Sequence, residues 1–160
     1  MSDLIRLAEQ LGARLQQRGW MLSAAESCTG GWVAKVVTDV AGSSGWFDRG
    51  FVTYSNDAKT EMLGVPVRVF KEHGAVSEAC VRAMALGSLA RSRSQLAVAI
   101  SGIAGPGGGS AEKPVGTVWM AWAIAGRCEA LKCHFPGERE QVRRAAVEQA
   151  LRGLLACCDW

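Results

Sequence analysis

The chain has 160 residues, a net charge of +3 and 49% hydrophobic residues. This length fits one domain spanning residues 1–160, and the hydrophobic fraction is high enough for a packed core, which excludes a disordered polyelectrolyte. The basic residues are scattered rather than clustered, which argues against nucleic-acid binding. The apolar run over residues 115–125 is too short to cross a bilayer, so we expect no membrane association.

Helices and strands are predicted to alternate along the first two-thirds of the chain. Leucines recur at helical spacing over residues 4–15, after a capping residue at position 2 or 3 and before Gly19. The expected elements that follow are a strand over 21–25, a helix over 29–40, a strand over 49–54, a short helix over 56–63, a long helix over 77–91 and a buried strand over 95–101.

The last third of the chain predicts a β-hairpin and a final helix. Two β-rich runs, 115–125 and 127–135, are joined at Gly126, and a helix is expected over 138–156. Alternating strands and helices closed by a hairpin predict an α/β fold, as a single three-layer α/β/α domain with a mixed sheet.

The six cysteines are expected to be reduced thiols. The first residues lack the basic and apolar segments of a secretory signal, so we expect a cytoplasmic protein. Cys128 and Cys133 lie on a predicted strand, and no second ligand pair follows at zinc-like spacing. We therefore expect neither a metal nor a cofactor.

Ser27 lies between a predicted strand and a predicted helix, where free N–H groups favour negative charge. A serine there can be a nucleophile or a phosphate ligand, or it can simply cap the helix. The only histidines, His73 and His134, lie outside the candidate segments, so lysine is the next candidate base. Lys59 can serve if its pKa is lowered, and is otherwise a solvated surface residue. Tyr54 can relay a proton, orient the lysine or merely end a strand.

The segment 101–109, which we call the glycine loop, is the most specific local signal of a ligand site. Its glycines, which include Gly102, Gly105 and Gly107, let the backbone approach a ligand and turn its N–H groups inward as an anion nest. The segment matches neither a Walker A loop nor a dinucleotide fingerprint, and a flexible loop is the alternative. Its position after a buried strand favours ligand binding.

Two arginines at the start of the last helix are candidate phosphate ligands. Arg139 and Arg143 are four residues apart and share a helix face, so they can clamp a phosphate. The alternative is a solvated charged face paired with Glu138, Glu140 and Glu148.

Four of these segments, in this order, resemble the CinA C-terminal domain family, whose enzymatic members are nicotinamide-nucleotide amidases. They are Glu-Ser-Cys-Thr-Gly-Gly at 26–31, Tyr-Ser-Asn at 54–56, Ser-Gly-Ile-Ala-Gly-Pro at 101–106 and Lys-Pro-Val-Gly-Thr at 113–117. The resemblance covers nearly the whole chain. It implies hydrolysis of the carboxamide of nicotinamide mononucleotide to nicotinate mononucleotide and ammonia.

The resemblance also implies roles for individual residues. Ser27 would be the nucleophile, Lys59 the base and Tyr54 the motif tyrosine, while Ser101 stands where family members often carry threonine. A phosphate-side arginine would be Arg139 or Arg143, and the sequence leaves both open.

Further substrate contacts are expected from two glycine-containing segments. We expect Thr29, Gly30 and Gly31, or the glycine loop, to hold the oxyanion through backbone N–H groups. A non-catalytic module that binds a phosphorylated nucleotide or has a regulatory role is the alternative function. We also expect a homo-oligomer, with an apolar hairpin around Trp119 and Trp122 as a candidate interface and buried core as its alternative.

Overall fold

Five strands form one mixed sheet in the computed structural model, which describes residues 2–160. Their spatial order is β2-β1-β3-β4-β5. The strands are β1 (Leu22–Glu26), β2 (Phe47–Val52), β3 (Leu96–Gly102), β4 (Thr117–Ile124) and β5 (Arg127–His134). The central β1 pairs in parallel with β2 and β3, whereas β3, β4 and β5 pair in antiparallel. The predicted α/β fold with a mixed sheet is confirmed.

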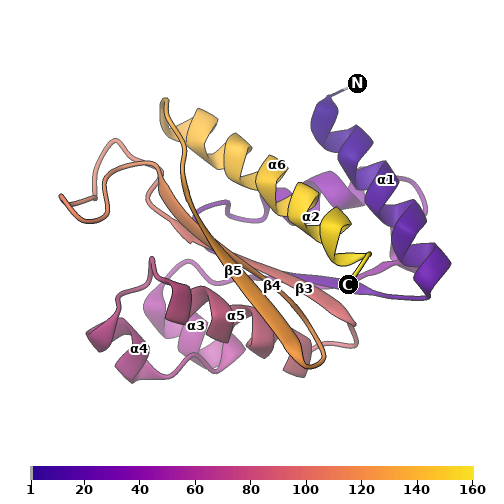
Figure 1. The fold of residues 1–160 in the computed structure, drawn as a ribbon, viewed down its shortest axis with the longest axis horizontal. Coiled ribbons are helices and arrows are strands. Elements are labelled where there is room, and N and C mark those ends of the chain that lie inside the picture. The colour runs from indigo at the N-terminus through magenta and orange to yellow at the C-terminus, as the bar shows by residue number, and fades with distance from the viewer. Residues whose placement is uncertain (1) are drawn as a thin grey trace.

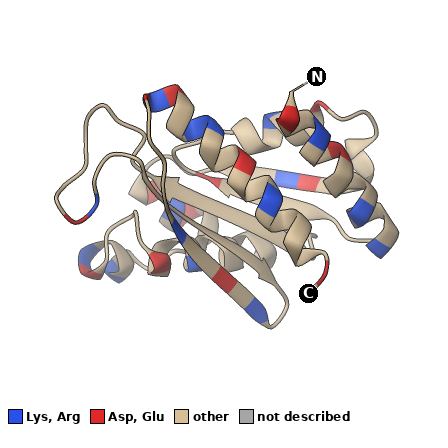
Figure 2. Ribbon diagram, turned by 45° about the horizontal axis from the view of Figure 1, so that its top comes forward, with Lys and Arg blue, Asp and Glu red and all other residues tan. Residues whose placement is uncertain are grey.

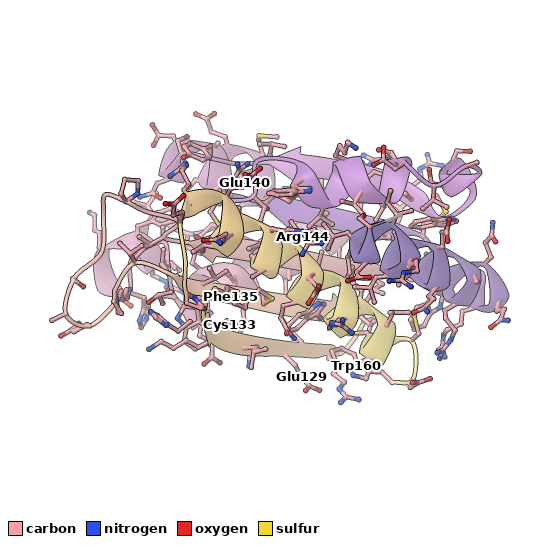
Figure 3. The ribbon with its side chains drawn as sticks, turned by 90° about the horizontal axis from the view of Figure 1, so that it is seen from above. Glu129, Cys133, Phe135, Glu140, Arg144 and Trp160 are labelled. Atoms are coloured by element: carbon pink, nitrogen blue, oxygen red, sulfur yellow. The ribbon has the colours of Figure 1, made fainter. Side chains whose placement is uncertain are left out.

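Helices cover both faces of this sheet, which makes three layers (Figure 1). One face carries α1 (Asp3–Arg18), α2 (Trp32–Thr38) and α6 (Arg139–Cys157), and the other carries α3 (Asn56–Leu63), α4 (Val67–Glu72) and α5 (Glu78–Ala90). The first layer is seen from above in Figure 3, where Glu140 marks the start of α6, with Phe135 toward that end of the helix and Trp160 toward its other end.

Two helices differ from the sequence prediction. Helix α2 begins at Trp32 rather than at residue 29, because Gly30 and Gly31 adopt φ values of +59° and +100° that a right-handed helix cannot contain. Helix α4 was not predicted: it is six residues long, buries none of them and follows Pro66. So short a segment has no repeating apolar face to recognise.

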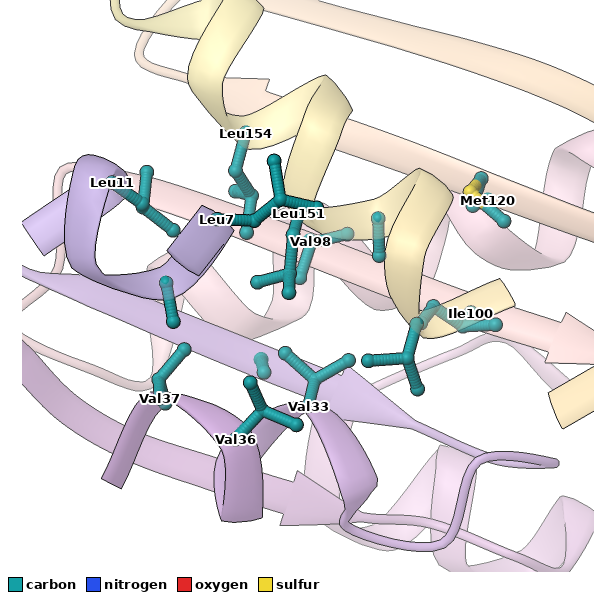
Figure 4. Close-up of a cluster of buried hydrophobic side chains, with 14 of the residues drawn as sticks. Leu7, Leu11, Val33, Val36, Val37, Val98, Ile100, Met120, Leu151 and Leu154 are labelled. Atoms are coloured by element: carbon teal, nitrogen blue, oxygen red, sulfur yellow. The ribbon is translucent and has the colours of Figure 1, made fainter. Parts of the chain in front are cut away.

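The core lies in two layers, one on each side of the sheet. The strand β3 is buried over six of its seven residues and contributes to both layers. The layer under α1, α2 and α6 is the larger one, and Figure 4 shows part of it: Leu7, Leu11, Val33, Val36, Val37, Val98, Ile100, Met120, Leu151 and Leu154. The leucines at helical spacing over residues 4–15 and the strand predicted to be buried over 95–101 both lie in this core, as the sequence predicted.

The hairpin β4–β5 packs against α6 on one side. Trp122 is buried, and its indole N–H donates to the carbonyl of Ala150 at 3.1 Å. Trp119 is partly buried against the opposite core layer. The two tryptophans therefore lie largely in the core, which was the alternative to an interface strip.

Acidic and basic residues are interspersed along both α1 and α6 (Figure 2). On α6, Glu148 lies 4.0 Å from Arg144 and 3.5 Å from Arg152. Such exposed pairs contribute little stability, so the fold depends on its core.

Three further properties concern residues 2–160 as a whole. The six cysteine side chains are unpaired. Within this range no cluster of three or more candidate metal-ligating side chains occurs. Nor does any helix of the described chain have the length and hydrophobicity needed to cross a membrane.

Candidate active site

The candidate residues meet where β1, β2 and β3 end. These three strands are parallel, so their carboxyl ends lie at the same edge of the sheet, and Ser27, Tyr54 and Ser101 come from the three ends in turn. A cavity of about 300 Å³ opens there, which we call the carboxyl-end cavity. It is lined by Ser27, Cys28, Tyr54, Asn56, Lys59, Ala75, Val76, Ser101, Gly102, Ile103, Ala104, Gly105, Gly107 and Arg139.

Lys59 and Ser27 are in direct contact at the base of this cavity. The Nζ atom of Lys59 lies 3.0 Å from the Oγ atom of Ser27. It also lies 3.0 Å from the carbonyl oxygen of Thr53 and 3.4 Å from that of Tyr54. Ser55 caps α3 by accepting from the N–H of Ala58, so the helix starts directly after β2 and turns Lys59 back toward β1.

Lys59 is a buried residue, so the alternative of a solvated surface lysine is wrong. Its residue surface is 1% exposed, and this burial lowers the pKa of its amine below the ordinary value of 10.5. Negative charge on Cys80 and Cys28 would oppose the shift. Burial raises the pKa of each of these thiols to about 11, however, so both are uncharged at neutral pH. The environment therefore favours a neutral amine.

Ser27 does not cap the following helix. The N-cap of α2 is Gly31, which makes no side-chain bond, and the carboxylate of Glu26 accepts from the N–H groups of Val33 and Ala34 instead. The residue is itself buried, at the carboxyl end of β1. Its hydroxyl is left facing Lys59, which is the arrangement a serine nucleophile requires.

The backbone carbonyl of Tyr54 contacts Lys59, and the Tyr54 ring lies at the mouth of the cavity. The residue is 63% exposed, and its phenol oxygen is 3.3 Å from Nη2 of Arg139. Nη1 of Arg139 donates to the carbonyl of Gly105 at 2.8 Å. Arg139 therefore joins Tyr54 to the glycine loop across the opening.

Arg143 lies outside this cavity. Its Nε donates to the carbonyl of Cys28 at 3.0 Å and its Nη2 to that of Thr29 at 3.3 Å. Its guanidinium is 5.5 Å from the centre of the Trp32 ring. The structure thus separates the two arginines that the sequence left equivalent: Arg139 reaches the carboxyl-end cavity, and Arg143 holds the turn after β1.

Thr29, Gly30 and Gly31 do not line the cavity that Ser27 and Lys59 share. They line an adjoining hollow of about 410 Å³ together with Trp32, Lys35, Glu140 and Arg143. The hydroxyl of Thr29 donates to Glu26 at 2.7 Å and is fully buried. The structure therefore does not bring these three predicted substrate-binding residues into the carboxyl-end cavity.

The glycine loop lines the cavity with Ser101, Gly102, Gly105 and Gly107. Gly105 has φ +83°, and a Cβ atom there would collide with Val115. The loop returns to the sheet through bonds between the backbones of Ile103 and residues 116–117. Glycine is required at position 105 for this close packing.

Sequence reasoning missed several residues around the site. Asn56 lines the cavity within a motif that had been recognised, so a signal for it existed. Ala75 and Val76 come from the connection between α4 and α5, which carries no polar signal. Glu26 lies in a recognised motif, but the spacing of residues in the sequence does not predict the buried bonds that it accepts from the first N–H groups of α2.

The fold and the paired side chains define an α/β domain with a buried serine–lysine pair at the carboxyl ends of parallel strands. The chain belongs to the CinA C-terminal domain family, whose model matches residues 4–158. It is 58% identical over 156 residues to the nicotinamide-nucleotide amidohydrolase PncC of Escherichia coli (strain K12), covering 96% of this chain and 93% of that protein. The protein of the same name from Pseudomonas putida is 50% identical over 155 residues, covering 97% of each.

Solved structures show the same fold. The crystal structure of competence/damage inducible protein CihA from Agrobacterium tumefaciens matches with a TM-score of 0.96 at 46% identity, over 100% of this chain and 98% of that one. A CinA superfamily protein from Klebsiella pneumoniae 700603 matches with a TM-score of 0.95 at 39% identity, over 99% of this chain and 100% of that one.

Proposed function

We propose that this protein is an amidohydrolase that converts nicotinamide mononucleotide to nicotinate mononucleotide and ammonia. The observation that carries the proposal is the 3.0 Å contact between Lys59 Nζ and Ser27 Oγ inside a polar cavity. The amidohydrolase names of its relatives, at 50–58% identity over most of the chain, support the same reaction and a small nucleotide substrate.

Lys59 is the proposed base, and the three oxygens around it suit a neutral amine. Nζ can donate to all three oxygens when it is protonated. A neutral amine has two N–H groups and one lone pair, so it can keep its bonds to the carbonyls of Thr53 and Tyr54 and accept from the Ser27 hydroxyl once the proton of that bond lies on Ser27. As Ser27 Oγ bonds to the amide carbon, its proton passes to Lys59.

The remaining steps return the enzyme to its starting state. Lys59 gives its proton to the amide nitrogen, the C–N bond breaks and ammonia leaves. Water then attacks the Ser27 ester, losing a proton to Lys59, and the nicotinate product departs as the Ser27 hydroxyl re-forms. The positive pyridinium beside Lys59 would further favour the neutral amine.

The backbone N–H of Cys28 is the proposed oxyanion donor. The Gly30 N–H already donates to the carbonyl of Ser27, and the Ser27 N–H donates to Ile100. Among the residues the structure describes, the Cys28 N–H has no hydrogen-bond acceptor, and Cys28 lines the cavity. A donor of this kind contributes about 3–4 kcal/mol to transition-state stabilisation in hydrolases.

Arg139 is the proposed phosphate ligand. Its guanidinium lies at the mouth of the cavity, so a nucleotide with its amide at Ser27 would extend toward it. For Tyr54 we propose a role in closing the mouth and in holding Lys59 through its carbonyl. Thr29, Gly30 and Gly31 act indirectly in this scheme, by shaping the turn that carries Ser27.

We also propose that residues 1–160 act as one catalytic domain in the cytoplasm and assemble as a homo-oligomer. Large apolar side chains are exposed near the edge strand β2 and on α3 and α4: Val52, Tyr54, Met62 and Val67. Light scattering should give a mass of at least two chains, and cell fractionation should recover the protein with the cytoplasm. The mass of one chain would contradict the assembly.

Ammonia release from nicotinamide mononucleotide by the purified, metal-free protein tests the function, with Ser27→Ala as the matched variant. We expect release by the wild type and none above background by the variant. If neither protein releases ammonia while the nucleotide still binds, the chain is the non-catalytic binding module instead.

A further inference from the structure

Glu26 is a buried carboxylate directly before the proposed nucleophile. It is the last residue of β1 and is 1% exposed. Its Oε1 accepts from the Thr29 hydroxyl at 2.7 Å and from the Val33 N–H at 2.9 Å. Its Oε2 accepts from the Ala34 N–H at 3.1 Å. Both oxygens are therefore engaged.

These bonds tie the turn over residues 27–31 to the end of the strand. Helix α2 receives no side-chain bond from its own N-cap, so the Glu26 carboxylate satisfies two of its first N–H groups. The backbone of Glu26 is held in turn, because its carbonyl accepts from the N–H of Thr53 at 2.9 Å. One residue thus fixes both ends of the turn.

The same turn carries the two groups that the proposed reaction uses at the amide carbon. Ser27 supplies the attacking oxygen, and the Cys28 N–H is the proposed oxyanion donor. Arg143 also binds this turn, donating to the carbonyls of Cys28 and Thr29. The turn is therefore held by the buried Glu26 carboxylate and by a guanidinium, and its position relative to Lys59 depends on both.

We propose that Glu26 is a positioning residue for the hydrolysis, and this inference rests on the proposed function. It does not touch the reacting atoms, because it does not line the carboxyl-end cavity and its oxygens are occupied. It acts by holding Ser27 Oγ against Lys59 Nζ and by keeping the Cys28 N–H beside the reacting carbon.

The variant Glu26→Gln tests this role with little change in shape. The amide keeps one oxygen, but its NH₂ group must face at least one of the N–H or O–H donors that the carboxylate accepts from. The turn then shifts, and we expect kcat to fall on the order of 100-fold, as small misplacements of reacting groups do. We expect KM to change by less than about 3-fold, because the proposed phosphate ligand is untouched.

A matched control separates positioning from general loss of stability. Ser88→Ala removes a buried hydrogen bond to Ser23, at the other end of β1 and away from the cavity. At equal folded fraction, measured by thermal unfolding, Ser88→Ala should keep wild-type kcat. The pH midpoint of activity should be the same in Glu26→Gln as in wild type, since Glu26 is not among the charges acting on Lys59.

Each outcome is decisive. A kcat for Glu26→Gln within about 3-fold of the Ser88→Ala value would overturn the inference, as would a KM that rises in step with the fall in kcat. Silence of the wild type would overturn the proposed function, and this inference with it. An active wild type beside a fully active Glu26→Gln overturns the positioning role alone.

Discussion

The two ends of the parallel strands both carry a cavity, and the two cavities differ in chemistry. The carboxyl-end cavity, of about 300 Å³, holds Ser27 and Lys59. The amino-end hollow, of about 640 Å³, is mostly apolar and is lined by Trp20, Leu86, Leu89, Ala90, Ser94, Gln95, Ile124, Ala125 and Gly126. The volume of a cavity therefore does not identify the proposed active site. The polar groups that converge around a desolvated amine at the carboxyl end do.

Serine hydroxyls are buried near both ends, but with different partners. Near the amino end, Ser23 lies 2.7 Å from Ser88 and 2.8 Å from Ser94, so the hydroxyls bond to one another. At the carboxyl end, the Ser27 hydroxyl bonds to an amine whose pKa is lowered. The hydroxyl of Ser23 has only hydroxyl partners and so no neighbouring base, whereas Ser27 has the proposed base Lys59 as its partner.

The largest expected effect is the loss of the base at the carboxyl end. Lys59→Met should reduce kcat roughly 1,000-fold, because proton transfer by a positioned base contributes about 10²–10⁴-fold. The methionine fills similar space without a charge to desolvate, so thermal unfolding should show no loss of stability. Lys71→Met on the exposed face of α4 is the control. Steady-state ammonia release within tenfold of wild type would show that Lys59 is not the base.

A smaller effect should distinguish the two arginines. Arg139→Met should raise KM for nicotinamide mononucleotide about 10–100-fold with kcat nearly unchanged, because a charge-assisted bond to the phosphate is worth about 1.5–3 kcal/mol. Arg143→Met should instead lower kcat, since it loosens the turn that carries Ser27. Initial-rate kinetics on both variants would test these roles. A fall in kcat for Arg139→Met with a rise in KM for Arg143→Met would contradict the assignment of Arg139 as the phosphate ligand.

The lowered pKa of Lys59 predicts a pH profile. In the proposed mechanism the neutral amine is the active form, so kcat/KM should rise with pH, with its midpoint below the ordinary 10.5. Stability should also rise with pH between the lowered pKa and 10.5, because the unfolded chain binds the proton more tightly in that window. Urea unfolding of wild type and Lys59→Met across this range checks the linkage. Equal slopes for the two proteins would count against it.

The smallest effect on activity should come from the amino-end hollow. Trp20 is half-buried, with the Arg18 guanidinium 3.9 Å from its ring centre. Trp20→Ala should cost about 2 kcal/mol of stability through lost packing and leave kcat and KM unchanged. Chemical denaturation and ammonia release measured on the same preparation test both halves. A change in KM for Trp20→Ala would contradict this prediction and show that the amino-end hollow affects substrate binding at the carboxyl-end cavity.

Much of the architecture followed from the sequence alone. Leucine spacing predicted α1, the buried run before Ser101 predicted β3, and the hairpin followed from two β-rich runs around Gly126. These signals are local, because the burial of a helix or strand face repeats along a few consecutive residues. The motifs around Ser27, Tyr54 and Ser101 were each placed at the end of a predicted strand. That these three ends meet at one edge follows from the parallel pairing of β1 with β2 and β3 in the structure.

The tertiary structure alone decided which polar side chains share a cavity. Arg139 and Arg143 are equivalent by spacing, and one turn of α6 places them in different surroundings. Lys59 has no signal of burial on its own helix. Only tertiary packing, which sets α3 against α5 and places Lys59 beside Ser27, removes its water and lowers its pKa. Sequence periodicity records which face of an element is buried. Contacts between elements distant in sequence determine a side chain's partners and charge state, so they appear only when the chain is folded.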